Sequence, residues 1–222
     1  MKNVGIFAVV LVLVVSFSTV ASGQTSSKVL LIPREGYSMD PDLMIKMELG
    51  VMRLLLKNAK LDVDVATATG NPIIGPTEKF TDIKQLRTIK LDEYAGVIIA
   101  CMAVGGAIQP PPGTSPEVLA IVKKAVADGK PVATNGNASN VLAEAGVLKG
   151  RKYSYVRDPL IATDAIPFTL PVFKDAVYSG SGLVQDGLII TSGICPTIEK
   201  TSGVENGTVK LTKAFIAAVQ KK

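Results

Sequence analysis

Histidine is absent from all 222 residues of the sequence, and with it the side chain that most often transfers protons near neutral pH. No Ser-His-Asp or Cys-His pair can therefore form within one chain, and the commonest nitrogen ligand of zinc, copper and iron is missing. Cysteine is nearly absent too, because Cys101 and Cys195 are the only two. Two cysteines are too few for a zinc cluster. We therefore expect no metal, no cofactor and no histidine-dependent catalysis.

Aromatic residues are also scarce, at 5% of the chain, and the charged residues are scattered along it. The formal net charge of +5 comes from 24 Lys and Arg against 19 Asp and Glu. No basic stripe is interleaved with aromatic residues, so the composition indicates no nucleic-acid partner.

The first residues have the layout of a secretory signal peptide. Lys2 is followed by an apolar run over 4–17 and by small residues around 20–23. This pattern predicts a signal peptide over 1–23, a single domain over 28–222, and export to the periplasm or the exterior without stable membrane association. An uncleaved membrane anchor is the alternative, because an apolar stretch of about 17 residues reaches the lower limit for spanning a bilayer.

The rest of the chain alternates between apolar runs of strand length and helical patterns. The expected strands are 29–32, 61–66, 96–101, 131–134 and 188–191. The expected helices are 41–58 with Asp40 as N-cap, 116–128, 139–145 and 209–219. A surface loop is expected over 70–76 and an irregular excursion over 158–174. Such alternation predicts an α/β fold with a parallel sheet covered on both faces. In these folds ligands bind beyond the carboxyl ends of the strands.

The most distinctive segments are SPEV at 115–118, DGKPVA at 128–133 and AGVLKGRK at 145–152, followed later by DGLIITS at 186–192. Together they resemble the ThiJ/PfpI family of the class I glutamine amidotransferase-like superfamily. The resemblance covers roughly residues 28–197. It implies a flavodoxin-like, doubly wound sandwich with a mostly parallel central sheet.

The family's nucleophile is a cysteine on the sharp turn after the strand that 131–133 resembles. Counting back from 145–148 places Gly136 at that position, with Asn135 and Asn137 beside it. None of the three is a nucleophile. The resemblance therefore does not make the chain a hydrolase, and we expect a pseudo-enzyme.

The resemblance implies further residues of the cleft. The family has a glutamate after the first strand, and two residues match it loosely. Asp40 fits the spacing better, but we expect Asp40 to serve as an N-cap and Glu35 to be the carboxylate that faces the cleft. Gly105 and Gly106 resemble the glycine pair whose backbone N–H groups help to form an oxyanion hole, although a structural turn is an equal alternative. The expected ligand cleft comprises Glu35, Gly105, Gly106, Asn135, Gly136 and Asn137.

Three functions remain open at this stage. The leading hypothesis is a non-catalytic protein that binds a small molecule or a partner in the cleft. The second is a cysteine-dependent hydrolase or a glyoxalase or deglycase-type enzyme that uses a relocated thiol, Cys101 or Cys195, with Glu35 as a further catalytic candidate. The third is a structural role, for which the resemblance allows a homodimer.

Cys101 and Cys195 each close a predicted strand at the ligand end of the sheet. In the topology that the resemblance implies, the strand ending at Thr134 lies between theirs, which separates them by about 9–10 Å, beyond disulfide reach. A bridge requires both loops to curl over the middle strand, where Gly136 leaves room. A Cys101–Cys195 disulfide, favoured by an oxidising compartment, and two separate buried thiols both remain hypotheses.

Overall fold

The computed structural model describes residues 27–104, 113–164 and 167–221. The predicted signal peptide, Gly105 and Gly106 lie outside the described residues. No helix within the described ranges is long and apolar enough to cross a membrane.

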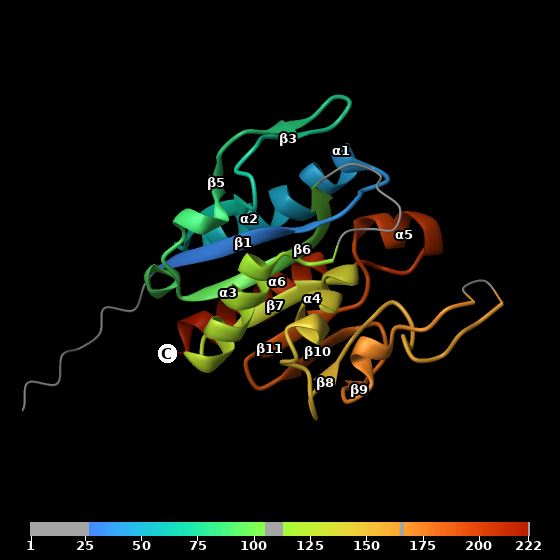
Figure 1. The fold of residues 1–222 in the computed structure, drawn as a ribbon. Coiled ribbons are helices and arrows are strands. Elements are labelled where there is room, and N and C mark those ends of the chain that lie inside the picture. The colour runs from blue at the N-terminus through green and yellow to red at the C-terminus, as the bar shows by residue number, and fades with distance from the viewer. Residues whose placement is uncertain (1–26, 105–112, 165–166, 222) are drawn as a thin grey trace, which may run out of the picture.

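A seven-stranded sheet forms the centre of the molecule (Figure 1), and its strand order is β10-β11-β7-β6-β1-β2-β5. All neighbours pair in parallel except β10 and β11, which are antiparallel. The predicted α/β fold with a mostly parallel sheet is thereby confirmed. The strands are β1 (Lys28–Glu35), β2 (Asp62–Thr67), β5 (Ile83–Gln85), β6 (Gly96–Val104), β7 (Val132–Asn135), β10 (Leu183–Asp186) and β11 (Ile189–Ser192).

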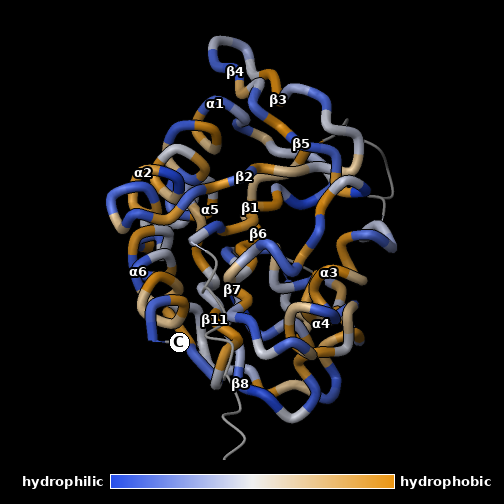
Figure 2. The backbone as a smooth tube through the Cα atoms, turned by 90° about the vertical axis from the view of Figure 1, so that its left-hand side faces the viewer, coloured by the Kyte–Doolittle hydropathy of each residue, from blue (hydrophilic) through white to orange (hydrophobic). Residues whose placement is uncertain are grey.

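Helices cover both faces of the sheet (Figures 1 and 2). One face packs against α1 (Pro41–Met44), η1 (Ile45–Gly50), α2 (Val51–Asn58) and α6 (Thr208–Gln220). The other packs against α3 (Pro116–Ala127) and α4 (Ser139–Glu144). Continuous apolar runs suit the central strands, because side chains on both of their faces are buried.

Short elements connect this framework. The helical ones are η2 (Leu86–Thr88), η3 (Leu91–Glu93), η4 (Gly136–Ala138), η5 (Pro171–Phe173) and α5 (Pro196–Ser202). The extended ones are β3 (Ile73–Ile74), β4 (Lys79–Phe80), β8 (Lys152–Tyr153) and β9 (Val177–Tyr178). The loop predicted at 70–76 therefore contains β3, which pairs with β4 as a short hairpin.

The predicted helix over 41–58 is present, but its middle third, η1, is a π-helix. A π-turn has wider spacing than an α-turn, so it changes which side chains face the sheet. The buried side chains are Met44, Ile45, Glu48, Leu49, Met52 and Leu56. Met47 and Leu54 point outward, with exposed fractions of 48% and 60%.

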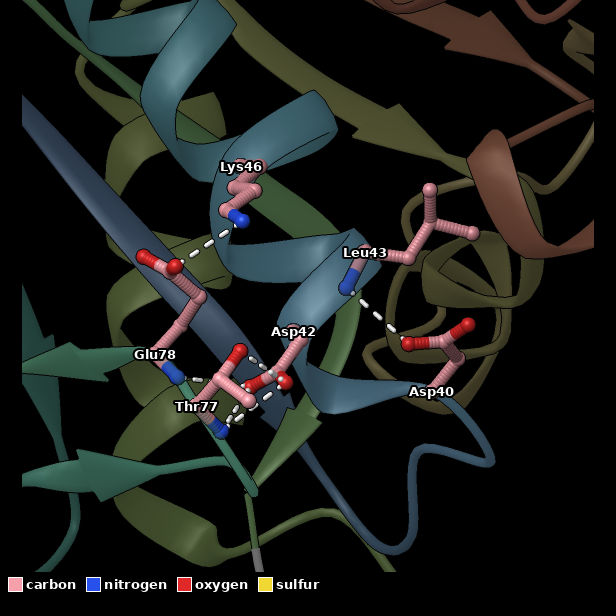
Figure 3. A network of polar contacts seen from close by, with 6 residues as sticks. All are labelled: Asp40, Asp42, Leu43, Lys46, Thr77 and Glu78. Atoms are coloured by element: carbon pink, nitrogen blue, oxygen red, sulfur yellow. Dashed lines mark hydrogen bonds and ion pairs between the residues drawn. The ribbon is translucent and has the colours of Figure 1, made fainter.

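Polar contacts fix the beginning of this helix (Figure 3). The Asp40 carboxylate accepts a hydrogen bond from the Leu43 backbone N–H at 3.0 Å, which confirms the predicted N-cap. The Asp42 carboxylate accepts from the backbone N–H groups of Thr77 and Glu78 and from the Thr77 hydroxyl. These bonds join α1 to the turn between β3 and β4.

Strand β1 does not end at Ile32 as predicted, but continues through Pro33 to Glu35. Its register against β6 shifts after Pro33, which pairs with Ala100, whereas Arg34 pairs with Ala103. Proline has no N–H to donate, and it occurs in sheets at such irregularities. Because of the shift, Cys101 and Met102 have no partner residue in β1. Their N–H groups are buried and need another acceptor.

Candidate functional site

The acceptor for these two N–H groups is the carboxyl group of Glu48. Its Oε1 accepts from the backbone N–H of Cys101 at 3.0 Å, and its Oε2 from that of Met102 at 2.7 Å. The side chain reaches them from η1 and is completely buried. The Asn135 Nδ2 group at the end of β7 also donates to Oε1, at 2.8 Å, and to the Thr208 hydroxyl at 3.1 Å. One buried acid thus links η1, β6 and β7.

Burial and, next, the neighbouring Cys101 thiolate raise the pKa of Glu48 to about 8, against the lowering effect of the three N–H donors. This carboxyl group therefore titrates near neutral pH, far above an ordinary glutamate. Sequence reasoning singled out Glu35 and missed Glu48. The available signal was the spacing of Glu48, which lies four residues from both Met44 and Met52 and so shares a helical face with them.

The two cysteines meet beneath the end of β7. Both are buried free thiols, and their Sγ atoms are 2.8 Å apart. As expected from the resemblance, β7 lies between β6 and β11. The separation of 9–10 Å expected from strand spacing is nevertheless wrong for the sulfur atoms. Cys195 lies beyond the end of β11 as the N-cap of α5, so it is outside the sheet. Cys101 lies within β6 rather than at its end.

Gly136 makes this meeting sterically feasible. It follows β7 directly and has a φ of +53°, a conformation that favours glycine. A Cβ atom there would lie 2.7 Å from the Cys101 Sγ and 3.1 Å from the Cβ atoms of both cysteines. The Cys101 sulfur thus occupies the space that a side chain at residue 136 would need.

The two thiols have different surroundings. The Cys195 thiol donates a hydrogen bond to the Cys101 sulfur, which lowers the pKa of Cys101 to about 7 despite its burial. The positive charge of Arg34 and the backbone N–H of Asn137 contribute to this lowering of the Cys101 pKa. Donation to Cys101, together with burial, strongly raises the pKa of Cys195. A single negative charge on the pair therefore resides on Cys101.

The remaining predicted residues lie around this centre. Glu35 is half-buried, and its Oε2 accepts from the Ser115 backbone N–H at 2.5 Å, at the beginning of α3. Asn135 belongs to the Glu48 network described above. Within the described part of the chain, no group of three or more Cys, Asp or Glu side chains is arranged to hold a metal ion.

A pocket of about 340 Å³ lies beside the centre, where β1 and β6 end. The Ser38 hydroxyl in its wall accepts a hydrogen bond from the Ala103 backbone N–H at 2.8 Å. Its lining residues are Tyr37, Ser38, Pro41, Pro72, Ile73, Ile74, Met102, Ala103 and Val104.

Comparison with known proteins identifies the family of this chain. Residues 39–200 match the family model described as the DJ-1/PfpI family, whereas no curated protein sequence matches the chain. A ThiJ/PfpI domain protein from Brachyspira murdochii has a similar structure, with a TM-score of 0.59, 13% identity, and coverage of 89% of this chain and 99% of the other.

Two further solved structures are similar. DJ-1beta from Drosophila melanogaster has a TM-score of 0.55 and 17% identity over 88% of this chain and 95% of its own. Rapid Encystment Protein 24 KDa from Francisella tularensis has a TM-score of 0.61 and 17% identity over 86% and 98%. At these identities the structural similarity establishes the fold, while the family match covers most of the sequence. The chain therefore belongs to the DJ-1/PfpI family.

Proposed function

We propose that this chain is an exported DJ-1/PfpI protein that binds a small molecule beyond the carboxyl ends of β1 and β6 and performs no catalysis at the family's nucleophile position. The observation that carries the proposal is the packing around Gly136. Glycine has no group that attacks a carbonyl carbon. In addition, the Cys101 sulfur fills the space of a side chain at residue 136, so a nucleophile introduced there would displace it.

The pocket beside Met102 supports the binding part of the proposal. In open α/β sheets, ligands bind outside the carboxyl ends of the strands, and this pocket lies there. Its volume is within the range of small-molecule sites, and its lining combines apolar side chains with a few polar groups. Ile74 at the pocket is 74% exposed, so it can be replaced without disturbing the core.

The test combines binding and turnover assays on the mature chain. Peptidase, glyoxalase and deglycase assays should show no turnover above a heat-killed control. Compounds that raise the melting temperature in a small-molecule screen should lose this effect in Ile74→Arg and keep it in Ile161→Arg. The control position is also an exposed isoleucine, at 59%, but does not line the pocket. Equal loss in both variants would contradict binding at this pocket.

A second candidate function is an enzyme of the hydrolase, glyoxalase or deglycase type that uses Cys101. The lowered pKa of about 7 favours it, because much of the thiol is then ionised at neutral pH without any histidine. Turnover by the wild type that Cys101→Ser abolishes would replace the first proposal with this one.

A further inference from the structure

We propose that Cys101 and Cys195 form a redox-active dithiol, in which a hydroperoxide oxidises Cys101, Cys195 resolves the product into a disulfide, and an external dithiol reduces it again. This activity is independent of ligand binding in the pocket. It uses two thiols that face each other below the sheet end, and it needs no histidine.

The two sulfur atoms need to move only a short distance to convert the dithiol into a disulfide. The Sγ atoms are 2.8 Å apart, about 0.8 Å more than the length of a disulfide bond. Both Cβ atoms lie 3.1 Å from the same point, where a side chain on Gly136 would begin. Because Gly136 has no side chain at this point, the sulfur atoms can approach across the end of β7 without a rearrangement of the strands.

The surroundings assign a different role to each thiol. Cys101 accepts the hydrogen bond from Cys195 and lies near the Arg34 guanidinium, whose Nε donates to the Cys101 carbonyl oxygen at 2.8 Å. Both features favour a thiolate, the form that attacks peroxides. Cys101 is therefore the attacking thiol and Cys195 the resolving thiol.

The reaction is balanced in two steps. The Cys101 thiolate attacks one peroxide oxygen and the O–O bond breaks; the departing alkoxide or hydroxide takes up a proton as alcohol or water, and Cys101 becomes a sulfenic acid. The Cys195 sulfur then attacks the Cys101 sulfur, the S–O bond breaks, and hydroxide leaves with the proton of the Cys195 thiol as water. The two thiols and one hydroperoxide yield one disulfide, one alcohol or water, and one water. Two exchange reactions with a dithiol restore both thiols and leave the reductant as its own disulfide.

The experiment treats the reduced, full-length mature chain with hydrogen peroxide and then alkylates the remaining thiols under denaturing conditions. We expect one equivalent of peroxide to remove both alkylatable thiols, a Cys101–Cys195 peptide pair in a non-reducing digest, and recovery of both thiols after dithiothreitol acts on the folded protein. In Cys195→Ser the reaction should stop at a sulfenic acid on Cys101, which dimedone traps. In Cys101→Ser the rate of thiol loss should fall at least about tenfold, because the remaining thiol is the protonated one.

Three results would overturn the proposal. The first is wild-type protein that keeps two alkylatable thiols after peroxide treatment. The second is oxidation of Cys101 to sulfinic acid without an intermediate disulfide. The third is a disulfide that dithiothreitol reduces only after denaturation, since the bond would then be a permanent structural link. Circular dichroism of both serine variants checks that loss of reaction does not reflect loss of the fold.

Discussion

Replacing Gly136 with alanine should destabilise the protein through two separate effects. The backbone there has a φ of +53°, and a left-handed conformation costs an L-residue about 1–2 kcal/mol. The new Cβ would also lie 2.7 Å from the Cys101 Sγ, and overpacking of a buried site typically costs about 1–3 kcal/mol. We expect a total loss of about 2–5 kcal/mol in the free energy of unfolding.

Gly146→Ala is the matched control. Gly146 has a similar φ of +71°, but a Cβ there would meet no atom within 4 Å. This variant should therefore show the backbone effect without the steric one. The steric effect makes Gly136→Ala less stable than Gly146→Ala. In urea unfolding, with a slope of about 2 kcal/mol/M, this difference should lower the midpoint of Gly136→Ala by about 0.5–1.5 M relative to that of Gly146→Ala.

The double variant Gly136→Ala with Cys101→Ala tests whether the Cys101 sulfur causes this additional loss of stability. Removing the sulfur atom should recover part of the steric loss, so the two substitutions should be non-additive by about 1 kcal/mol or more. Equal midpoints for Gly136→Ala and Gly146→Ala, or strict additivity in the double variant, would refute the packing argument.

Three other predictions address charge and processing. Because the pKa of Glu48 is raised from 4.5 to about 8 in the folded protein, its contribution to stability should be complete below about pH 4.5 and be lost as the pH rises through about 8. Urea unfolding across this range should show that loss in the wild type and a smaller one in Glu48→Gln. Cys195→Ala removes the hydrogen-bond donor, so the pKa of Cys101 should rise above about 7, which the pH dependence of alkylation measures; an unchanged value would contradict the pairing. Mass spectrometry of the native protein should find a mature N-terminus near Ser22 or Gln24, and an intact Met1 form in washed membranes would indicate an anchor instead.

The sequence was sufficient to predict the framework of the fold. Apolar runs at 29–32 and 96–101 lie in buried central strands, and Asp40 caps the first helix as expected. These features are local, since strand length, apolar continuity and capping chemistry are read from a few neighbouring residues.

The centre of the site depends on features that are not local. Glu48 lies in the π-helix η1, and its N–H partners at Cys101 and Met102 are available because the register of β6 against β1 shifts after Pro33. Likewise, a separation estimated from the spacing between strands holds only for residues that lie within the sheet. It failed for Cys195, which lies past the end of β11. Sequence periodicity contains no information on either departure.

The π-helix also has an evolutionary consequence. One residue fewer in an α-helix rotates all side chains on one side of the gap by about 100° relative to the other side. Because η1 is a π-helix, whose hydrogen bonds span one residue more than those of an α-helix, a single deletion within Ile45–Gly50 can instead be absorbed by conversion to an α-turn, with α1 and α2 kept in place. A change in chain length within Ile45–Gly50, as well as a substitution at Glu48, is therefore a route by which related chains would gain or lose this centre.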